Sequence, residues 1–546
     1  MKKTSSKLLS LAMVLVMVLS MVACEPTQTE NPTNKDLYTN ETGYPICSET
    51  ITLTVSGIQG NTTDWNNTYF VKYVEEKLGI KRECTPFPKD AASTQYSTMI
   101  ASQSMPDIMV NMGIDKGQVN GDGADGYWLD ISEYLDIMPN LKAKLEKYPE
   151  WAAYMKDPDG SIYGLNRTAP SVFSNSRGTI NYNKTLVSAA YSGEIKTIED
   201  FYNALKAVKA MYPDKTPLAV TFDAAPAYNV DIILRTAFGI EFNDNSYMLV
   251  EGKDGKVELG ELSDNYRAYL TWMNKLYDEG LLVYDPDLSA NAYKANVKEG
   301  DYIFWSVAGS SGLTLTDYSD IGIIAALTSQ YQPEPTYILN PGVTTNARIF
   351  INANTENPKA VCRLIDFLCS PEGEILAVYG EEGKTYDVVE DAFGLTNYVV
   401  DAYADTENYA SISAWQQQVI APYQAFALNW GWLAEQLDSL DDATLTQMAN
   451  TAEYNYQWAA KTLLELRKCN VKVAPAPQVY DSSVGSLRSA YAADLTSYLK
   501  LAKVSFITGE LDITKESAWN EFTTKAGNMW NVLQPYEQAA WDAMGK

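Results

Sequence analysis

An alternation of strand and helix patterns over the first half of the chain is the feature that most constrains its fold. Residues 51–56, ITLTVS, alternate apolar and polar side chains and are rich in β-branched residues, which predicts a strand. In the helix pattern that follows, Asp64 is a suitable cap and Gly79 a suitable end. The alternation consists of strands at 51–56, 80–84 and 107–111 with helices at 64–78 and 91–103 between them. This order predicts an α/β fold in which helices cover a parallel sheet.

The same alternation continues through the middle of the chain. It comprises strands at 178–183, 216–222 and 301–309 and helices at 197–211 and 264–279, and the pattern becomes mostly helical after about residue 403. A chain of 546 residues exceeds what one simple hydrophobic core supports. Two or more domains are therefore expected.

The N-terminal segment has the three parts of a secretory signal. Lys2, Lys3 and Lys7 form a basic start, and the 16 residues from 8 to 23 are nearly all apolar. A membrane-spanning helix needs about 20 apolar residues. We therefore interpret residues 1–23 as a signal peptide and not as a retained membrane span.

Cys24 lies where this signal ends. The sequence Met21-Val22-Ala23-Cys24 resembles a bacterial lipobox, whose cysteine becomes the acylated first residue of the mature chain, although Met21 departs from the usual Leu or Val. Residues 25–41 are polar and almost free of large apolar side chains, which predicts that residues 24–47 form a flexible tether. We expect a lipid-anchored protein on the extracellular face of a bacterial cytoplasmic membrane, with a folded body that begins near residue 48.

Composition excludes several classes of function. Without the three lysines of the signal, 39 of the 42 basic residues remain against 69 acidic residues, a net charge of −30 that is poor for binding nucleic acid. The chain contains no histidine, which excludes Ser-His-Asp and Cys-His catalysis and HExxH metal sites. Catalysis by two carboxylates stays compatible with the composition.

Cysteines and acidic loops give no cofactor or metal motif. Cys362 and Cys369 stand seven residues apart in an apolar helical pattern, which predicts core packing. A disulfide between Cys47 and Cys84 is compatible with the strands that they flank. The loop at 120–130 lacks the register of calcium ligands that an EF-hand needs. We expect no catalytic residues, no cofactor and no bound metal.

Aromatic side chains are the remaining indication of function, with 12 Trp, 37 Tyr and 14 Phe. Most are expected in hydrophobic cores, and core packing explains each tryptophan as well as a ligand contact does. Some, such as Trp65 and Trp305, come near the ends of predicted strands. Ligands bind at the carboxyl ends of strands in open α/β sheets, and aromatic rings there can cover the C–H faces of sugars.

Several segments are similar to stretches of one known family. They are MPDIM (105–109), WLDISEYL (128–135), DGSIYGLN (159–166), INYNKTLV (180–187), KTIEDFYNALKAVK (196–209), NPKAVCRLIDFLCSPEGE (357–374), YGEEGKTYDV (379–388) and ITGELDI (507–513). Their order, together with the lipobox, resembles the large lipoprotein branch of the extracellular solute-binding proteins of family 1, the sugar-binding components of ABC importers. The resemblance runs from about residue 48 to 530.

The resemblance implies a two-lobed, periplasmic-binding-protein-like clamshell of type II with a helical C-terminal part, which closes about a hinge. By chain order, lobe one would comprise residues 48–175 and 340–388, and lobe two residues 176–339 and 389–546. Many members of this branch carry a calcium loop after the helix that corresponds to residues 196–209. Here the residues after EDFYNALKA read VKAMYPDKTPLAV and lack the ligands, so we expect no calcium there.

The resemblance carries the binding residues over only loosely, through the loops that would line the cleft. These loops nominate Asp64, Trp65, Asn111, Arg177, Tyr228, Trp305 and Trp432 as ligand-binding residues. Trp and Tyr would stack on sugar rings. Asp64, Asn111 and Arg177 would form hydrogen bonds with hydroxyl groups or with a uronate.

The sequence therefore predicts a monomeric substrate-binding protein of an ABC transporter that captures an oligosaccharide and delivers it to the permease subunits. A peptide or other small-solute receptor of the same fold is the alternative within this class. A secreted two-carboxylate glycoside hydrolase is the alternative from another class. A surface adhesion protein would predict repeats or a β-rich body, and neither pattern is present.

Overall fold

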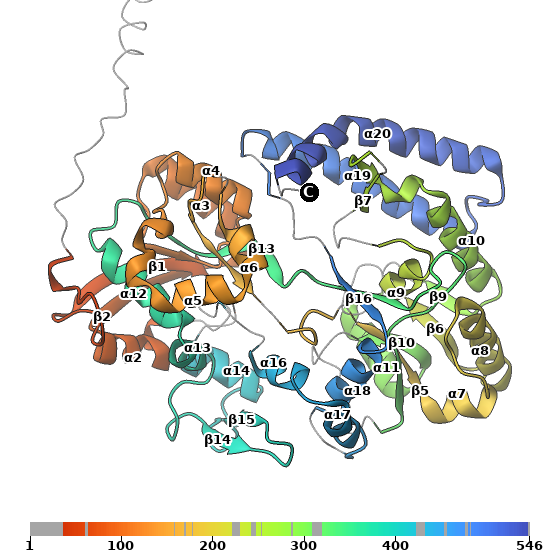
Figure 1. Ribbon diagram of the computed structural model, residues 1–546, viewed down its shortest axis with the longest axis horizontal. Coiled ribbons are helices and arrows are strands. Elements are labelled where there is room, and N and C mark those ends of the chain that lie inside the picture. Colours follow the sequence, from red (N-terminus) through yellow and green to blue (C-terminus); the bar gives the residue numbers. More distant parts are fainter. Residues whose placement is uncertain are drawn as a thin grey trace, which may run out of the picture.

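The computed structural model describes residues 36–60, 64–157, 159–168, 171–176, 178–220, 230–241, 247–252, 254–284, 288–307, 319–421, 428, 432–452, 456–474, 479–480 and 482–543. Figure 1 shows two α/β bodies side by side, one formed mainly by the red and orange part of the chain and the other mainly by the yellow, green and blue parts. We call them lobe one and lobe two. This arrangement agrees with the predicted two-lobed clamshell.

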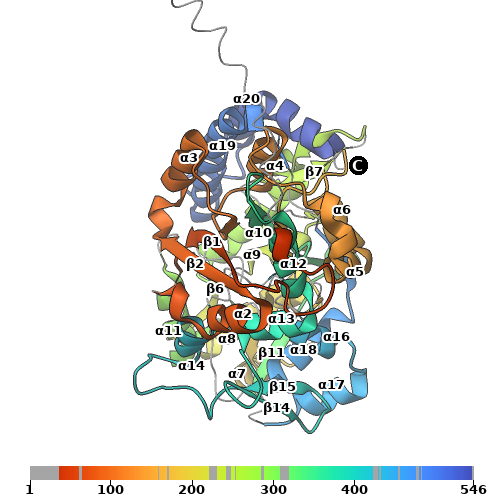
Figure 2. The same ribbon diagram turned by 90° about the vertical axis from the view of Figure 1, so that its left-hand side faces the viewer.

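Lobe one is built on a five-stranded sheet in the order β2-β1-β3-β13-β4. Its strands are β1 (Ile51–Ile58), β2 (Ile80–Phe87), β3 (Ile108–Val110), β4 (Leu165–Thr168) and β13 (Val343–Ile351). Its helices are α2 (Tyr69–Leu78), α3 (Ala92–Ser102), α4 (Lys116–Ala124), α5 (Pro139–Lys147), α6 (Pro149–Met155), α12 (Pro358–Cys369) and α13 (Pro371–Val378). Figure 2 views this lobe from the side, with α2 and α12 around the strands.

Lobe two is built on a second five-stranded sheet in the order β11-β5-β10-β6-β9. Its strands are β5 (Thr179–Asn183), β6 (Thr216–Val220), β9 (Leu282–Tyr284), β10 (Tyr302–Val307) and β11 (Ile321–Ile324). Its helices include α7 (Lys184–Ala190), α8 (Ile198–Met211), α9 (Asp231–Thr236), α10 (Asp264–Asp278), α11 (Ala290–Glu299), α19 (Ser482–Thr508) and α20 (Glu516–Ala543). The long helices α19 and α20 contribute Leu495, Phe506 and Trp530 to its hydrophobic core.

Local sequence explains these elements directly. Asp64 accepts a hydrogen bond from the backbone N–H of Asn66 and caps the short 3-10 helix Trp65–Asn67 that precedes α2. Gly79 ends α2 with φ 72°, a conformation that glycine adopts without steric cost. Thr197 and Asp200 form a capping box at the start of α8. The predicted core role of the two cysteines of α12 is confirmed, because both are buried.

One strand in each sheet runs antiparallel to its neighbours, which differs from the predicted parallel sheet. β13 is antiparallel to β3 and β4, and β5 is antiparallel to β10 and β11. Both strands enter their sheet straight from the other lobe. A parallel connection within one sheet needs a crossover segment, usually a helix. A strand that arrives across the hinge enters at the edge where the parallel strands of the sheet end. It must therefore run antiparallel to those strands.

The first two crossings between the lobes lie next to each other. The backbone N–H of Asn340 donates to the carbonyl of Asn175 at 2.8 Å. The hydroxyl of Tyr337, in strand β12 (Thr336–Leu339), donates to the carbonyl of Gly178 at 2.7 Å. These hydrogen bonds hold the two segments together at the place where the lobes meet.

The segment after residue 388 packs differently from the predicted division. Residues Val400, Trp415, Ile420 and Leu428 lie in the core of lobe one, whereas everything after residue 388 was predicted to belong to lobe two. The elements here are β14 (Asp387–Glu390), β15 (Thr396–Val399), α14 (Ile412–Trp415), a π-helix (Gln416–Ile420), α16 (Trp432–Asp438), α17 (Asp442–Ala449), α18 (Gln457–Leu466) and β16 (Asn470–Val473). Chain order alone does not reveal which core a short apolar segment joins.

The predicted tether is folded over its last part. Asp36 accepts hydrogen bonds from the backbone N–H groups of Lys359 and Ala360 and so caps α12. The guanidinium of Arg363 donates to the carbonyl of Gly43 at 2.8 Å, and Ile46 is fully buried. The folded body therefore begins by Asp36 and not near residue 48, because polar contacts that composition does not reveal hold the segment on α12.

The lobes also touch away from the crossings. Helix α4 of lobe one lies against α19 of lobe two at the top of Figure 1. A Cβ atom on Gly117, in the first turn of α4, would lie 2.2 Å from the carbonyl oxygen of Tyr480. The Tyr480 hydroxyl donates to Glu537 on α20 at 2.6 Å, which fixes this side of the contact to lobe two.

Among the helices that the structure describes, none combines the length and the apolar character needed to cross a membrane. Cys47 and Cys84, for which a disulfide was compatible with the sequence, are both buried free thiols.

Candidate functional site

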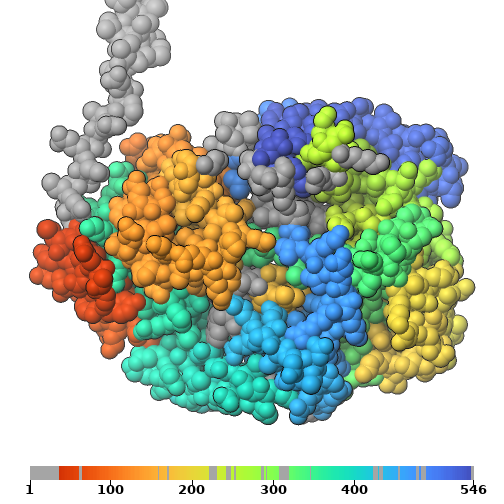
Figure 3. Space-filling model, viewed as in Figure 1, coloured from red at the N-terminus to blue at the C-terminus, as the bar shows by residue number. Residues whose placement is uncertain are grey.

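The carboxyl-end edges of the two sheets lie on either side of the crossings. In lobe one, β4 ends where β13 begins, because Thr168 pairs with Val343. In lobe two, β10 ends where β5 begins, because Val307 pairs with Thr179. Figure 3 shows the surface hollowed between the lobes. Open α/β sheets bind ligands at such edges, so this region is the candidate site.

Lobe one places two arginines and an asparagine at its edge. Arg348 on β13 donates from Nη1 to the side-chain oxygen of Asn111, and the Asn111 backbone N–H donates to the Arg348 carbonyl at 2.7 Å. Arg167 on β4 is only 5% exposed. Burial lowers the pKa of Arg348 to about 9, and the positive charge of Arg167 contributes to this lowering. Asn111 also has φ 50°, which is uncommon for a residue other than glycine.

Lobe two places aromatic and amide groups beside the crossings. Trp458 on α18 donates from Nε1 to the side-chain oxygen of Asn181 on β5 at 3.0 Å. The ring of Phe173 meets the Trp458 ring edge-on, with 5.5 Å between the ring centroids. Phe173 belongs to the first crossing and is partly exposed, and its backbone N–H donates to Asp438 of α16. Trp458 is only 8% exposed, so Phe173 is the more accessible ring of the pair. An aromatic ring with nearby amide groups suits the binding of sugars.

Two of the nominated residues follow β1. Trp65 is fully buried in the core of lobe one, where its Nε1 donates to the carbonyl of Gln59 at 3.3 Å. The structure therefore gives Trp65 a packing role. Asp64 is exposed and accepts from the backbone of Asn66 at 3.0 Å, so its carboxylate caps the turn.

The remaining nominated residues are spread over both lobes. Asn111 lies at the candidate edge, as described. Trp305 is 5% exposed on β10. It pairs with Asn181 of β5, shares a buried cluster with Trp458, and lines a pocket of about 410 Å³ near the starts of β6 and β10. Because side chains alternate along a strand, proximity to a strand end does not tell where a ring points.

Several nominated positions lie outside the described residues. These are Arg177, Tyr228 and the lipidation site Cys24. Trp432 begins α16, and the structure describes only its backbone. Their predicted roles stay predictions.

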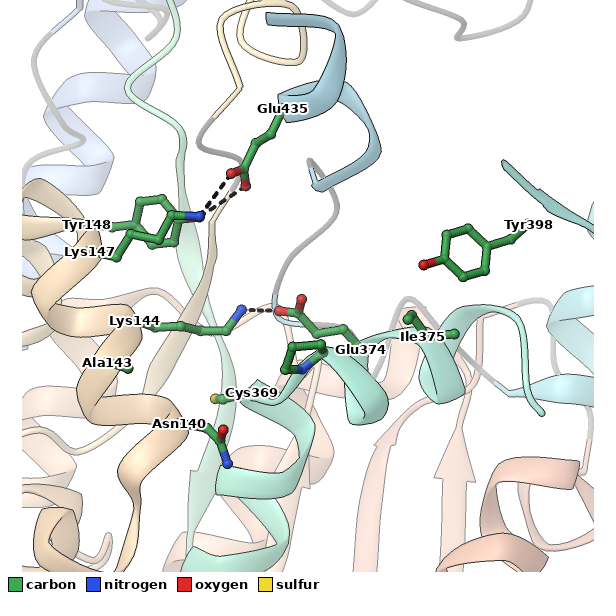
Figure 4. Close-up of a pocket in the computed structure, with 11 residues that line it drawn as sticks. Asn140, Ala143, Lys144, Lys147, Tyr148, Cys369, Glu374, Ile375, Tyr398 and Glu435 are labelled. Carbon is green, nitrogen blue, oxygen red and sulfur yellow. Dashed lines mark hydrogen bonds and ion pairs between the residues drawn. The ribbon is translucent and has the colours of Figure 1, made fainter. Parts of the chain in front are cut away.

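A second pocket, of about 360 Å³, lies between α5, α13 and α16 (Figure 4). Lys144 of α5 forms an ion pair with Glu374 of α13, and burial raises the pKa of Glu374. Across the pocket, Glu435 of α16 accepts from Lys147 and from the Tyr148 hydroxyl, each at 3.0 Å. The pocket is therefore spanned by contacts that fasten α5 of lobe one to α16.

The described residues contain no group of three or more Cys, Asp or Glu side chains that could hold a metal ion. The connection between α8 and β6 comprises only residues 212–215. An EF-hand loop has twelve residues, so this connection has no room for one. The absence of calcium at this place stays a prediction.

Two α/β sheets with facing carboxyl-end edges, joined by paired crossings, define a two-lobed ligand-binding protein of the type II class. The comparison with known families agrees. The chain belongs to the bacterial extracellular solute-binding protein family, whose sequence profile matches residues 68–380.

Two curated relatives are similar over part of their length. The fructooligosaccharide ABC transporter substrate-binding protein FusA of Streptococcus pneumoniae serotype 4 (strain ATCC BAA-334 / TIGR4) is 28% identical over 267 residues, which are 45% of this chain and 49% of FusA. Lipoprotein LipO of Bacillus subtilis (strain 168) is 24% identical over 347 residues, 59% of this chain and 65% of LipO. The matched region thus spans about half to two thirds of these relatives.

Solved structures match over nearly the whole chain. The S. pneumoniae FusA structure in complex with kestose has a TM-score of 0.66 at 17% identity and covers 90% of this chain and 99% of its own. An extracellular solute-binding protein from Bifidobacterium longum subsp. infantis has a TM-score of 0.69 at 16% identity, with 91% and 99% covered. These similarities confirm the predicted fold.

Sequence reasoning missed Arg167, Arg348, Phe173 and Trp458. Arg348 stands in NARIFI, a strand pattern whose place next to β3 depends on a pairing between distant segments. Phe173 and Trp458 are separated by 285 positions in the chain, so no local spacing connects them. The one available indication was Arg167 itself, a charged residue directly after the segment DGSIYGLN (159–166) that resembles the family.

Proposed function

We propose that this chain is the substrate-binding protein of an ABC importer, which captures an oligosaccharide between its lobes and delivers it to the permease. The observation that carries the proposal is the pair of facing sheet edges, with guanidinium and amide groups on one side and, on the other, the partly exposed Phe173 ring that packs on the buried Trp458. Such a combination suits sugar hydroxyl groups and the apolar faces of sugar rings. The similarity to a fructooligosaccharide-binding relative supports an oligosaccharide as the ligand.

The same proposal covers location and organisation. Residues 1–23 are a signal peptide, and Cys24 carries the lipid that holds the mature chain at the extracellular face of the cytoplasmic membrane. The protein acts as a monomer, and its membrane partners are the permease subunits. Similarity to a lipoprotein supports the anchor. Lobe one comprises residues up to about 175 and from about 340 to about 428. Lobe two holds the second sheet and the C-terminal helices.

We propose a binding role without catalysis, because the family and the relatives are binding proteins. A ligand contact stays proposed for Asp64, Asn111, Arg177, Tyr228 and Trp432. Trp65 and Trp305 would have to leave buried positions to reach a ligand. A peptide or other small solute remains the alternative ligand, since related folds can bind different ligands.

Thermal unfolding of residues 25–546 against oligosaccharides and peptides tests the proposal. A ligand that binds only the folded protein, at about 100 times its Kd, adds roughly 2.7 kcal/mol to the free energy of unfolding. We expect the unfolding midpoint to rise with at least one class of oligosaccharide, and we expect the recovered sugar to be intact when analysed by mass spectrometry.

The alternatives predict other outcomes. A rise with peptides alone would keep the fold and replace the ligand. Shortened sugar products would support the two-carboxylate hydrolase instead. The control is a second extracellular binding protein whose sugar is known. A rise in its unfolding midpoint with that sugar shows that the sugar stocks are intact.

A further inference from the structure

The two arginines at the lobe-one edge come from neighbouring strands. Ala347 of β13 pairs with Asn166 of β4, and Arg348 and Arg167 are the next residues along each strand. In an antiparallel pair this places them diagonally, within reach of long side chains. The register shifts on both sides of Ala347, so β13 bulges at this position. Bulges commonly redirect a side chain next to a functional site.

Asn111 fixes the direction of one arginine. Its side-chain oxygen accepts from Arg348 Nη1, while its own backbone N–H is held by the Arg348 carbonyl. Asn111 reaches this geometry with a left-handed backbone at the end of β3. Strained residues of this kind persist where the surrounding structure holds them, and they gather at ligand sites.

The electrostatic consequence is that two positive charges lie close enough to affect each other. The chain as a whole carries a net charge of −27. Here, however, Arg167 is 5% exposed and Arg348 is half-buried beside it. Burial lowers the pKa of Arg348, and the neighbouring positive charge of Arg167 lowers it further. An anion between them would interact favourably with both.

We infer that Arg167 and Arg348, with Asn111 as the positioning residue, form a subsite for an acidic group on the captured sugar. A guanidinium presents its N–H donors in a planar fork that matches a carboxylate or a sulfate with two parallel hydrogen bonds. The subsite lies five residues from the start of β13, beside the crossings, and therefore at the base of the space between the lobes. The ligand class is an acidic oligosaccharide, with a uronate or a sulfate ester as the anion.

This inference rests on the proposed function, and its test separates the two. Isothermal titration calorimetry of residues 25–546 would use three sets of oligosaccharides. One set is released from uronate polysaccharides such as pectin and alginate, one from sulfated galactans, and one from neutral polysaccharides such as fructan, galactan and xylan. The methyl ester of each uronate ligand that binds provides a neutral match of the same sugar.

We expect an acidic set to bind, the methyl ester to bind at least tenfold more weakly, and affinity to fall as salt is added. Arg348→Gln and Arg167→Gln should each lower the affinity for the acidic ligand by about tenfold or more, the effect of losing one charged hydrogen bond. Arg348→Lys keeps the positive charge but not the planar, forked guanidinium, so its affinity for the acidic ligand should fall by less. Arg267→Gln, whose parent residue pairs with Glu516 away from the site, is the matched control and should bind normally.

Each outcome decides the matter. If neutral oligosaccharides bind as tightly as acidic ones, or only neutral ones bind, the inference is overturned while the proposed function stands. If none of the three sets binds, the proposed function falls and the inference with it. The unfolding midpoint of each variant without ligand shows whether a loss of binding reflects a loss of folding.

Discussion

At the scale of single residues, buried carboxylates hold distant parts of this chain together. Asp366 of α12 accepts from the backbone N–H groups of Asn140 and Leu141 at 2.7 and 2.9 Å. These groups lie in the first turn of α5, whose N-cap residue provides no side-chain acceptor. Asp366 therefore replaces the missing cap from another helix, 226 positions away.

Replacing Asp366 tests this role. Asp366→Ala leaves two backbone donors without an acceptor in a buried place and should lower the free energy of unfolding by about 2 to 4 kcal/mol. Urea unfolding followed by circular dichroism measures the change. Asp441→Ala is the control, because Asp441 caps α17 at an exposed position and its loss should cost less. Equal losses for the two variants would contradict the account.

Glu261 predicts a pH dependence. It is 5% exposed, accepts from the Met248 backbone N–H at 3.0 Å, and burial raises its pKa to about 7. The folded protein then binds a proton more tightly than the unfolded chain does, so this residue makes the free energy of unfolding fall as pH rises from about 5 to about 8.

The comparison of wild type with Glu261→Gln isolates the contribution of Glu261 to the free energy of unfolding. The amide matches the neutral acid and does not titrate. Relative to the variant, the free energy of unfolding of the wild type should fall by roughly 3 kcal/mol between pH 5 and pH 8. Urea unfolding at pH 5, 6, 7 and 8 measures the difference, and a difference that does not change with pH would refute the assignment.

At the scale of elements, the close approach of α4 to Tyr480 links the lobes. In Gly117→Ala the new methyl group would lie 2.2 Å from the carbonyl oxygen of Tyr480. The two segments must move apart to relieve this clash, at a cost of about 1 to 3 kcal/mol in the free energy of unfolding. If this contact belongs to the ligand-bound arrangement, the affinity for the ligand falls by about tenfold. Calorimetric titration measures it.

A second helical glycine provides the control for Gly117. A Cβ on Gly527 of α20 would meet only Leu262, at 3.9 Å. Gly527→Ala should therefore leave the affinity unchanged and raise the unfolding midpoint slightly, because alanine favours helix. An unchanged affinity in both variants would mean that α4 and Tyr480 do not take part in binding.

Sequence reasoning located the locally determined elements well. The pattern at 197–211 became α8, with its capping box, and the pattern at 264–279 became α10 within a residue. It could not supply what depends on distant pairing. The antiparallel placement of β13, the cap that Asp36 gives to α12 and the arginine pair of the candidate site all join residues far apart in the chain.

Tryptophans show the same limit at the candidate site. Trp65 and Trp305 were nominated for their position near strand ends, yet both are buried. Trp458 was not nominated; it packs beside Phe173 next to the crossings and, at 8% exposed, is itself buried. The chain order identifies loops at a sheet edge, but the direction of each ring is set by the packing around it.

At the scale of the whole molecule, the account places a lipid at Cys24. Cys24→Ser removes the thiol that we propose to be acylated, so the protein should leave the membrane fraction and should no longer incorporate labelled palmitate. Cell fractionation with a blot measures this in a bacterial host. The control is Cys47→Ser, whose parent thiol is buried in the folded body and carries no lipid. Retention of Cys24→Ser in the membrane fraction would disprove the anchor.

The central claim is that the two lobes capture an oligosaccharide by closing on it. Small-angle X-ray scattering of residues 25–546, with and without the oligosaccharide that raises the unfolding midpoint, tests it most directly. The account predicts a smaller radius of gyration in the presence of that sugar, with the sugar recovered intact. An unchanged radius of gyration with the sugar bound, or a sugar that is cleaved during the measurement, would contradict it.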